Sequence, residues 1–553
     1  MNERIDFQTE PGRWRHWRVE IDGPVATLWM DVDEAGGLFD GYELKLNSYD
    51  LGVDIELADA VTRMRFEHPE VRTVVLRSAK DGVFCAGANI RMLAGAEHAH
   101  KVNFCKFTNE TRNMFEAAAE ESGQTYIAAI KGSCAGGGYE LALACNHIML
   151  TDDGTSNVAL PEVPLLAVLP GTGGLTRVTD KRRVRRDIAD VFCAMEEGAR
   201  GPKALQWKLV DEVVPNARFD EVVAQRAREF AERAGKVEAE GIALPPLTRE
   251  ITPERVSYST VSADLDRAAG IVTITIRGPE GPPPASIEDL HAQGAETWAL
   301  RLARELDDLI LHLRFNELEM GVWVFRSEGD PGAVAAHEAH LLAHQGDDWL
   351  AREILLLWKR VLKRIDLTSR SLVALIEPGS CFAGMLAEIL FAVDRSFMAE
   401  GEFEGQEDKG EAQILLTEGN FGPYPMSNAL TRLETRFLGT PEAVEAARAH
   451  MGQPLTAEDA DALGLVTHAY DDIDWEDEVR IFLEERASFS PDALTGMEAN
   501  LRFAGPETME TRIFGRLTAW QNWIFQRPNA VGEDGALRRY GTGLRADYDR
   551  RRV

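Results

Sequence analysis

Three consecutive glycines stand directly before an acidic residue in GSCAGGGYELALAC, residues 132–145. The apolar residues that follow the glycines predict a short helix, which places Glu140 in its first turn. Backbone N–H groups at such a helix start attract anions. A phosphate fits poorly, because phosphate loops require Lys and then Ser or Thr after the last glycine, and Glu140 would repel it. We therefore expect an oxyanion hole, whose backbone donors face an oxygen that becomes negative during reaction.

Two further segments could complete such a site. In VFCAGANIRML (83–93), the small residues A-G-A follow a predicted strand, so a backbone N–H there can approach a ligand closely and act as a second donor. In NVALPEVPLLAVLPGTGGLTRV (157–178), Glu162 lies in a proline-bounded loop. Two carboxylates around one site can hold and split water, one as base and one as acid, especially where their repulsion raises one pKa.

Each of these features also has a purely structural interpretation. The glycine run by itself is typical of a tight turn with close backbone packing. Glu140 alone could be a helix-start acid favoured by the helix dipole, and Glu162 alone could be a solvated loop acid. Two small-residue donor segments and two carboxylates in this order form a more specific pattern.

Composition limits the class of protein. The 553 residues include 60 basic and 91 acidic side chains, and the formal charge of −31 argues against a general nucleic-acid or anionic-membrane surface. The six cysteines form no C-x-x-C pair and no metal spacing with histidine, so no metal site is predicted. No apolar run approaches the roughly 20 residues of a membrane helix, and the start of the chain has no apolar signal core. We expect a reduced, cytoplasmic protein without nucleic-acid or membrane partners.

The pattern of the first 235 residues is that of an α/β protein. Short β-branched runs predict strands at 25–30, 71–78, 125–132 and 147–153. Helical stretches separate these runs, which implies β-α units around a largely buried sheet. Prolines and a loss of periodicity at 236–265 predict a linker. The last stretch, 479–553, is predicted to be helical.

The pattern begins again after the linker. Five segments of the second copy resemble segments of the first copy in the same order. They are GIVTITIRG (like PVATLWMD), VWVFRS (like VVLRS), LIEPGSC (like AIKGSC), NALTRL (like GGLTRV) and DALGLV (like ALQWKLV). Five echoes in order indicate one fold present twice, as a catalytic domain at 1–235 and a degenerate repeat at 266–478. The triple glycine has become FAGM, and no A-G-A segment follows the second FRS. Glu388, the counterpart of Glu140, should therefore be dispensable for turnover.

At this point the chain resembles the crotonase (enoyl-CoA hydratase/isomerase) superfamily, strongly over about residues 20–235. The superfamily pattern is A-G-A-D, then G-G-G-x-E-L, then P-E and P-G-x-G-G, and all four occur here in order, with Asn89 in place of the usual Asp. The resemblance implies a ββα-superhelix spiral fold, here duplicated, with a C-terminal helical region. It also implies that the backbone N–H groups of Ala88 and Gly137 hold the thioester oxygen of a coenzyme A substrate.

The resemblance assigns further roles by matching position. Glu140 and Glu162 match the two catalytic glutamates of the hydratases, and Lys45 and Arg91 match basic residues near the coenzyme. Taken one at a time, Lys45 and Arg91 are ordinary solvated charges. Coenzyme A enters as part of the substrate, and the resemblance implies no further cofactor.

The segment HKVNFCKFTNETRNMFEAA would line the acyl end of the site. If it is helical, Cys105 and Asn109 share a face at i, i+4, while Phe104, Phe107 and Phe115 supply aromatic surface. An aromatic-sized acyl group with polar substituents would suit these side chains. In a catalytic role, Cys105 could donate a weak hydrogen bond or relay a proton to the ring oxygen, and a buried, inert thiol is its structural alternative.

The long two-copy layout and this segment resemble a ring-opening branch of the superfamily. That resemblance implies opening of 2,3-epoxybenzoyl-CoA (the dihydrodiol form) with two waters, which gives 3,4-didehydroadipyl-CoA semialdehyde and formate. An enoyl-CoA hydratase or isomerase with a structural second domain remains an alternative, as does a non-catalytic acyl-CoA-binding protein. The second copy could replace contacts that single-domain relatives obtain by oligomerising, so we expect a homodimer.

Overall fold

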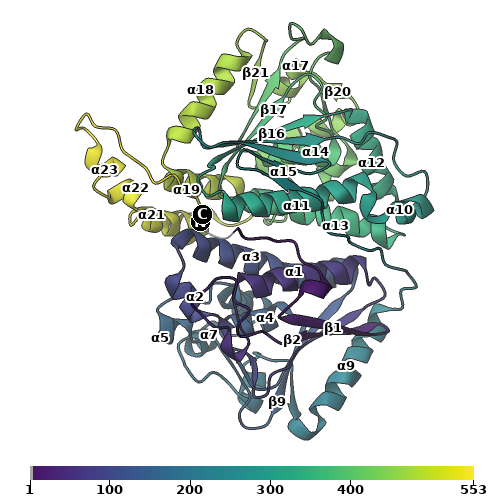
Figure 1. The fold of residues 1–553 in the computed structure, drawn as a ribbon, viewed down its shortest axis with the longest axis vertical. Helices are drawn as coiled ribbons and strands as arrows, with labels where there is room; N and C mark the ends of the chain where they lie inside the picture. Colours follow the sequence, from purple (N-terminus) through teal and green to yellow (C-terminus); the bar gives the residue numbers. More distant parts are fainter. Residues whose placement is uncertain (1–3) are drawn as a thin grey trace. The chain divides into compact units, whose positions relative to one another are not determined.

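The computed structural model describes residues 4–553, which divide into two compact units. The first unit is Asp6–Pro246, and the second unit is Leu247–Val553 together with residues 4–5. Figure 1 draws the first unit in purple to blue-green and the second in green to yellow. Each unit contains its own sheet with helices around it, so each can be described by itself.

The sheet of the first unit has the strand order β1-β2-β4-β7-β9-β11. The strands are β1 (Trp17–Asp22), β2 (Val25–Met30), β4 (Thr73–Ser78), β7 (Thr125–Ile130), β9 (His147–Asp152) and β11 (Glu212–Pro215). The β1-β2 pair is antiparallel and every later pair is parallel. The four strands predicted from β-branched runs are confirmed. Burial of five of the six residues of β7 explains why this central strand is apolar on both faces.

Helices and two small sheets complete the first unit. The helices are α1 (Leu51–Phe66), α2 (Ile90–Gly95), α3 (His98–Ala117), α4 (Gly137–Ala144), α5 (Glu162–Leu166), α6 (Gly174–Thr176), α7 (Arg186–Cys193), α8 (Gly201–Gln206) and α9 (Phe219–Ala234). One small sheet joins β10 (Asn157–Ala159), β8 (Ser133–Ala135) and β5 (Val83–Cys85), and the other joins β3 (Ser48–Tyr49) and β6 (Gly87–Ala88). The pairing of these short strands brings the A-G-A segment and the triple-glycine segment close together.

The sheet of the second unit repeats the order of the first. Its strands follow the order β12-β13-β14-β15-β16-β17-β18-β21. They are β12 (Glu250–Ile251), β13 (Arg255–Ser257), β14 (Val261–Asp266), β15 (Ile271–Arg277), β16 (Val322–Glu328), β17 (Ser371–Ile376), β18 (Arg395–Ala399) and β21 (His468–Tyr470). From β14 onward an antiparallel pair is again followed by parallel pairs. This shared order is what the sequence repeat predicts.

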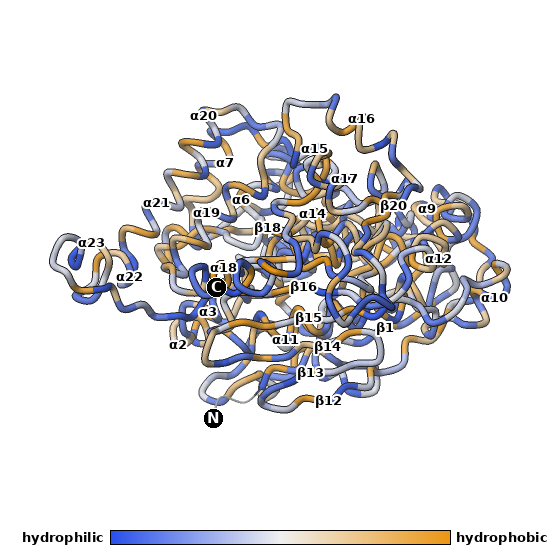
Figure 2. Tube along the Cα trace, turned by 90° about the horizontal axis from the view of Figure 1, so that it is seen from above, coloured by the Kyte–Doolittle hydropathy of each residue, from blue (hydrophilic) through white to orange (hydrophobic). Residues whose placement is uncertain are grey.

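The helices of the second unit follow its strands in the same manner. They are α10 (Ile287–Gln293), α11 (Trp298–Asn316), α12 (Pro331–His344), α13 (Trp349–Leu367), α14 (Gly384–Ala392), α15 (Arg432–Arg436), α16 (Pro441–Ala449) and α17 (Ala457–Ala462). The C-terminal part adds α18 (Trp475–Ser488), α19 (Pro491–Arg502), α20 (Met509–Thr511), α21 (Thr518–Ile524), α22 (Pro528–Val531) and α23 (Ala536–Arg539). Figure 2 colours the chain by hydropathy, and the first four residues of β16 are apolar and buried.

The predicted linker at 236–265 is wrong in its second half. Strands β12, β13 and β14 occupy much of 250–266 and form the antiparallel edge of the second sheet. The prolines of this segment lie outside the three strands, and four of the six residues of β14 are buried. The prolines therefore do mark interruptions of secondary structure, but the sequence pattern did not predict the short strands between them. The helical C-terminal region includes α18, which begins at Trp475, four residues before the predicted start.

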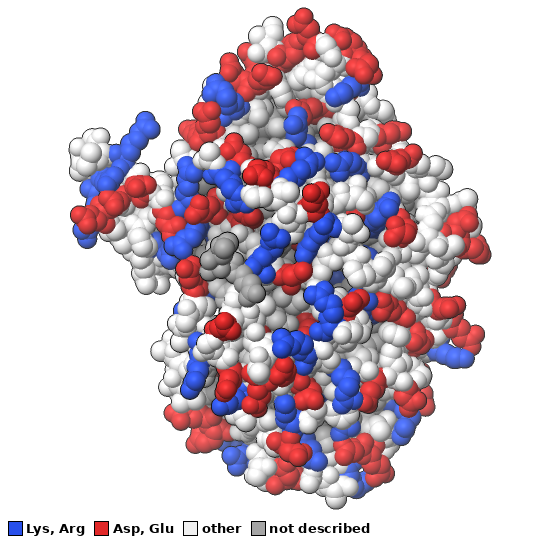
Figure 3. Space-filling model, viewed as in Figure 1, with Lys and Arg blue, Asp and Glu red and all other residues white. Residues whose placement is uncertain are grey.

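The surface charge and the apolar length of the helices can be read from the structure. On the face shown in Figure 3, acidic and basic side chains are interspersed. Within residues 4–553, no helix is long and apolar enough to cross a membrane. The same residues contain no group of three or more His, Cys, Asp or Glu side chains placed to hold a metal ion.

Candidate active site

The two predicted donor segments lie against each other in the first unit. Gly136 has φ +53° and precedes α4, whose first residue is Gly137. A Cβ atom at Gly87, in β6, would lie 2.7 Å from the backbone nitrogen of Gly137. Because the first N–H groups of a helix have no partner within the helix, the N–H of Gly137 can serve a ligand. Ala88 follows Gly87, so glycine at 87 permits the close approach that brings both predicted donors together.

Glu140 is buried in the first turn of α4 and is held at both carboxylate oxygens. The backbone N–H of Gly174 donates to its Oε1 at 2.7 Å, and the hydroxyl of Thr172 donates to its Oε2. Burial raises the pKa of Glu140, and the donors from Thr172 and Gly174 oppose that rise by stabilising the ionised form. The two donors also fix the direction in which the carboxylate faces.

Glu162 begins α5 and lies beside the glycine turn. A Cβ atom at Gly136 would come 3.1 Å from Oε1 of Glu162, and its Oε2 has no hydrogen-bond partner within residues 4–553. Burial, followed by the negative charge of Glu140, raises the pKa of Glu162 to about 7. The predicted pair of carboxylates is therefore brought together, with one oriented by donors and one able to hold a proton near neutral pH.

The predicted acyl-end segment is the helix α3. Cys105 is partly buried, and burial together with the charges of Glu140 and Asp54 raises the pKa of its thiol to about 11. The thiol is thus neutral at pH 7 and can donate only a weak hydrogen bond. The side-chain amide of Asn109 donates to the carbonyl of Gly171 at 3.1 Å, so it contacts the loop that also carries Thr172.

Lys45 and Arg91 form a separate, exposed group. The ammonium of Lys45 lies 2.7 Å from the carboxylate of Glu43, and 66% of the Lys45 side chain is exposed. The charge of Arg91 acts on both members of this pair. The structure thus brings the two predicted coenzyme-binding residues near each other, although Glu43 partly neutralises them.

Asn89, which replaces the superfamily's usual Asp, has a structural role here. Its side-chain oxygen accepts from the N–H of Met92 at 3.0 Å and caps α2. Its amide donates to the carbonyl of Glu43 at 2.8 Å and to the hydroxyl of Ser48 at 3.1 Å. An aspartate could accept the first bond but could not donate the other two.

Several residues of the site were missed by the sequence analysis. Thr172 and Gly174 both donate to Glu140, and both lie in the quoted P-G-x-G-G motif, so the signal was present but was not assigned to a role. Arg112 lies buried on α3 and donates to Asp54 of α1 at 2.8 Å. No short-range pattern links these last two residues, because their pairing depends on the packing of α1 against α3.

The second unit contains a counterpart of the helix start, but its carboxylates are occupied. Glu388 of α14 accepts from the side-chain amide of Asn420 at 2.8 Å and from Arg432 at 3.0 Å. Glu338 of α12 accepts from the hydroxyls of Tyr424 and Thr417, and a side chain at Gly384 would overlap its carboxylate. The carboxylates of both glutamates are therefore hydrogen-bonded to side chains of the same unit.

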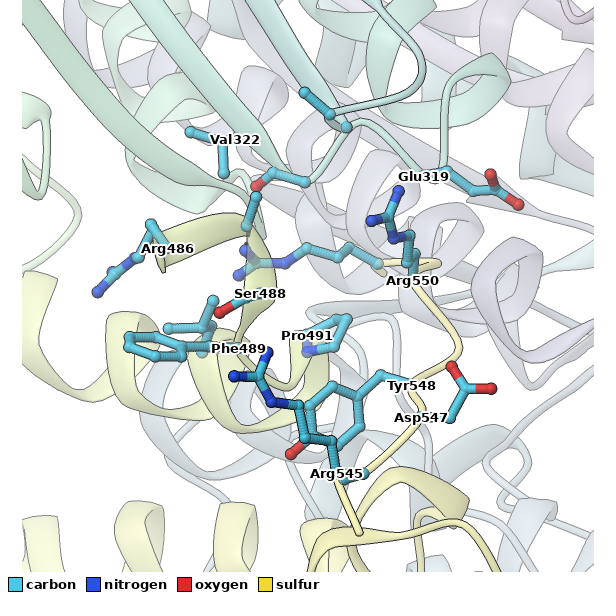
Figure 4. A pocket seen from close by; sticks show the side chains of 17 residues that line it. Glu319, Val322, Arg486, Ser488, Phe489, Pro491, Arg545, Asp547, Tyr548 and Arg550 are labelled. Atoms are coloured by element: carbon cyan, nitrogen blue, oxygen red, sulfur yellow. Dashed lines mark hydrogen bonds between the residues drawn. The ribbon is translucent and has the colours of Figure 1, made fainter. Parts of the chain in front are cut away.

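A cavity of about 280 Å³ lies elsewhere in the second unit, beside the start of α19. Figure 4 shows Arg486, Phe489, Arg545 and Tyr548 among the side chains that line it. Arg486, like the neighbouring Arg552, donates to the buried carboxylate of Glu498. The bond from Arg552 anchors the C-terminal end of the chain, and none of the predicted site residues lines this cavity.

Comparison with known proteins places this geometry in a family. The sequence profile of the enoyl-CoA hydratase/isomerase family matches residues 43–240. The benzoyl-CoA-dihydrodiol lyase of Aromatoleum evansii is 54% identical over 554 residues, which cover 100% of this chain and 98% of that protein. The chain belongs to the benzoyl-CoA-dihydrodiol lyase family of the crotonase superfamily.

Other relatives share only part of the chain. The fatty acid oxidation complex subunit alpha of Idiomarina loihiensis is 36% identical over 172 residues, which cover 31% of this chain and 23% of that protein. Among solved structures, an enoyl-CoA hydratase from Bacillus anthracis is 28% identical with a TM-score of 0.33, and the match covers 39% of this chain and 76% of that one. The match to the lyase of Aromatoleum evansii, in contrast, extends over both units of the chain.

Proposed function

We propose that this protein opens the ring of 2,3-epoxybenzoyl-CoA with two waters and releases 3,4-didehydroadipyl-CoA semialdehyde and formate. The proposal is supported by the full-length identity to the lyase of Aromatoleum evansii. The structural observation that carries it is the pair of buried carboxylates, Glu140 and Glu162, beside the glycine turn that precedes α4. A protein that only binds an acyl-CoA needs neither carboxylate.

The backbone N–H groups of Ala88 and Gly137 hold the thioester oxygen. Donors fixed before the reaction begins stabilise negative charge on that oxygen without the cost of reorganising solvent. The positive end of α4 adds to this effect. With its oxygen held in this way, the thioester withdraws electrons from the ring, which makes the ring carbons susceptible to attack by water.

Glu140 and Glu162 divide the acid–base work. Glu140 receives two hydrogen bonds that favour its ionised form, so it acts as the base that takes a proton from water. Glu162 has a pKa of about 7 and an oxygen without a protein partner among residues 4–553, so it delivers a proton to the leaving ring oxygen. Two carboxylates whose surroundings separate their pKa values are a known basis for such a division.

The remaining predicted residues bind the substrate. Cys105 and Asn109 of α3 contact the oxygenated acyl group, with Cys105 as a weak donor or proton relay. Lys45 and Arg91 bind the anionic part of coenzyme A at the exposed edge of the site. The overall conversion adds the atoms of two waters and divides the carbon skeleton, so its balance requires no external oxidant or reductant.

Formate release tests the proposed reaction. Purified protein incubated with 2,3-epoxybenzoyl-CoA should release one formate for each thioester consumed, and the C6 semialdehyde thioester should appear at the same rate. Crotonyl-CoA serves as the comparison substrate. Rapid hydration of crotonyl-CoA without formate from the epoxide would identify an enoyl-CoA hydratase with a structural second unit. Binding of both thioesters without turnover would identify an acyl-CoA-binding protein.

We also propose that the protein acts in the cytoplasm as a homodimer. Support comes from the presence of two copies of the fold in one chain, because the second copy can provide contacts that single-copy proteins obtain from further subunits. Light scattering should give a mass near twice the 61.3 kDa of one chain. A hexamer would contradict this assembly.

A further inference from the structure

Tyr49 has no role in the scheme above, although it lies beside both oxyanion donors. It belongs to the two-residue strand β3 and pairs with Ala88 of β6 in parallel register. Its carbonyl accepts from the N–H of Asn89 at 2.8 Å, which fixes the backbone of Tyr49 next to the first donor segment. The strand thus places a tyrosine where its side chain can extend toward α4.

The hydroxyl of Tyr49 ends against Gly137, the second donor. A Cβ atom at Gly137 would overlap this hydroxyl, so the tyrosine fills the space that a side chain at 137 would need. In an α-helix the Cα–Cβ bond is tilted toward the N-terminus, the end at which the first N–H groups face outward. The hydroxyl therefore lies at the same end of α4 as the N–H of Gly137.

This hydroxyl is buried and unsatisfied. Tyr49 is 1% exposed, and its oxygen has no hydrogen-bond partner within residues 4–553. Buried hydroxyl groups are normally hydrogen-bonded, and those that are not call for an explanation such as a ligand. A substrate oxygen bound to the N–H of Gly137 would supply the missing acceptor.

The ring of Tyr49 is held in place by charged and aromatic neighbours. The guanidinium of Arg112 lies over the ring, 5.4 Å from its centroid, and the ring of Phe104 lies 6.0 Å away. Arg112 is fixed in turn by its buried ion pair with Asp54. These contacts orient the hydroxyl before substrate arrives, which is the condition for a donor that stabilises developing charge.

We propose that the hydroxyl of Tyr49 donates a third hydrogen bond to the thioester oxygen, alongside the N–H groups of Ala88 and Gly137. The proposal rests on the proposed function, because it requires a coenzyme A thioester in this site. Burial raises the pKa of Tyr49 well above its usual value, so the group remains an O–H donor at neutral pH and is not a base. Tyr49 is then a catalytic residue that strengthens the withdrawal of electrons from the ring.

Phenylalanine at position 49 tests the proposal because it removes only the hydroxyl. Tyr49→Phe should lower kcat by about 10- to 100-fold, while KM changes less than about threefold and the melting temperature does not fall. Tyr126→Phe is the matched control, since Tyr126 is fully buried in β7 and its ring stacks on Phe115. The control should retain kcat. Unchanged kcat in Tyr49→Phe would overturn the proposal.

A spectroscopic readout separates this proposal from the proposed function. Benzoyl-CoA labelled with ¹³C at its carbonyl should show a lowered C=O stretching frequency when it binds, and Tyr49→Phe should reverse part of that shift. A shift identical in wild type and Tyr49→Phe would exclude the third hydrogen bond. If the wild type polarises the carbonyl but releases no formate from the epoxide, the proposed reaction fails while the role of Tyr49 stands.

Discussion

The helix starts of α4 and α14 each contain a glycine of positive φ but leave their glutamates in opposite situations. Gly136 lies directly before α4 with φ +53°, and Gly384 is the first residue of α14 with φ +46°. Each glycine is followed four residues later by a buried glutamate, which is Glu140 in α4 and Glu388 in α14. Among residues 4–553, Glu140 receives hydrogen bonds from two neutral donors, a threonine hydroxyl and a glycine N–H. Glu388 is bound to the guanidinium of Arg432. A glycine of positive φ at the helix start therefore does not by itself conserve a site.

One arginine in each unit accounts for much of this difference. In the first unit Arg177 forms two hydrogen bonds of 2.9 Å with Glu116, the next-to-last residue of α3. In the second unit Arg432 binds Asp366, the next-to-last residue of α13, and also reaches Glu388. In the first unit, among residues 4–553, the arginine therefore makes no hydrogen bond to Glu140. In the second unit the arginine binds the equivalent carboxylate of Glu388, which becomes part of a buried ion pair.

The second unit also fills the space in front of its helix start. The carboxylate of Glu338 occupies the place beside Gly384, and burial raises its pKa to about 7. In the first unit the corresponding side of Gly136 faces Glu162, which retains an oxygen without a protein partner among residues 4–553. The comparison teaches that the first copy keeps polar groups available, whereas the second satisfies them internally.

The largest expected effect is on turnover in the first unit. Glu140→Gln and Glu162→Gln should each lower kcat by at least about 100-fold, because each removes one proton-transfer group. Binding of benzoyl-CoA should stay within about threefold of wild type, since the backbone donors remain. Steady-state kinetics and calorimetry measure the two quantities. Near-normal kcat in either variant would remove that residue from the mechanism.

The matching change in the second unit should affect stability instead. Glu388→Gln weakens a fully buried ion pair with Arg432, which should lower the free energy of unfolding by about 1–3 kcal/mol. The kcat of the folded protein should stay within about twofold of wild type. Denaturant unfolding and active-site-normalised kinetics provide the check. A folded variant that loses turnover would mean that the second unit takes part in catalysis.

A third change distinguishes the acyl ends of the two copies. Counted back from Glu116 and Asp366, Cys105 of α3 falls at the position of Leu355 in α13, so only the first copy has a thiol at this position. If Cys105 contacts the ring, Cys105→Ala should lower kcat by about tenfold with an unchanged melting temperature, and Cys105→Ser should retain more activity. Full activity, or a loss that follows stability, would make Cys105 a packing residue.

The smallest expected effect is a shift of a titration. In the proposed mechanism Glu162 acts as an acid, and its pKa is about 7, so kcat should fall as pH rises above 7. The negative charge of Glu140 contributes to that raised pKa, so Glu140→Gln should lower it. Infrared difference spectra of the carboxyl band follow Glu162 directly in the variant. An unchanged or higher pKa would show that the two carboxylates do not interact.

The parts of the candidate site that lie in short sequence motifs could be predicted from the sequence. The glycine turn, Glu140 and Glu162 lie in short motifs, and the order of strands repeats because the β-branched runs repeat. Tyr49 was not predictable, since a strand of two residues has no periodicity and its approach to Gly137 depends on tertiary packing. The same holds for Glu338, which reaches Gly384 from a helix that the sequence repeat did not single out.

The number of thioester sites per chain tests the central claim most directly. Calorimetric titration of the full-length protein with benzoyl-CoA should give one site per chain, located in the first unit. Glu338→Gln should leave that number unchanged, because the side chain still fills the space beside Gly384. Two sites per chain in the wild type would contradict the account, since the second copy would then bind substrate despite its internally satisfied glutamates.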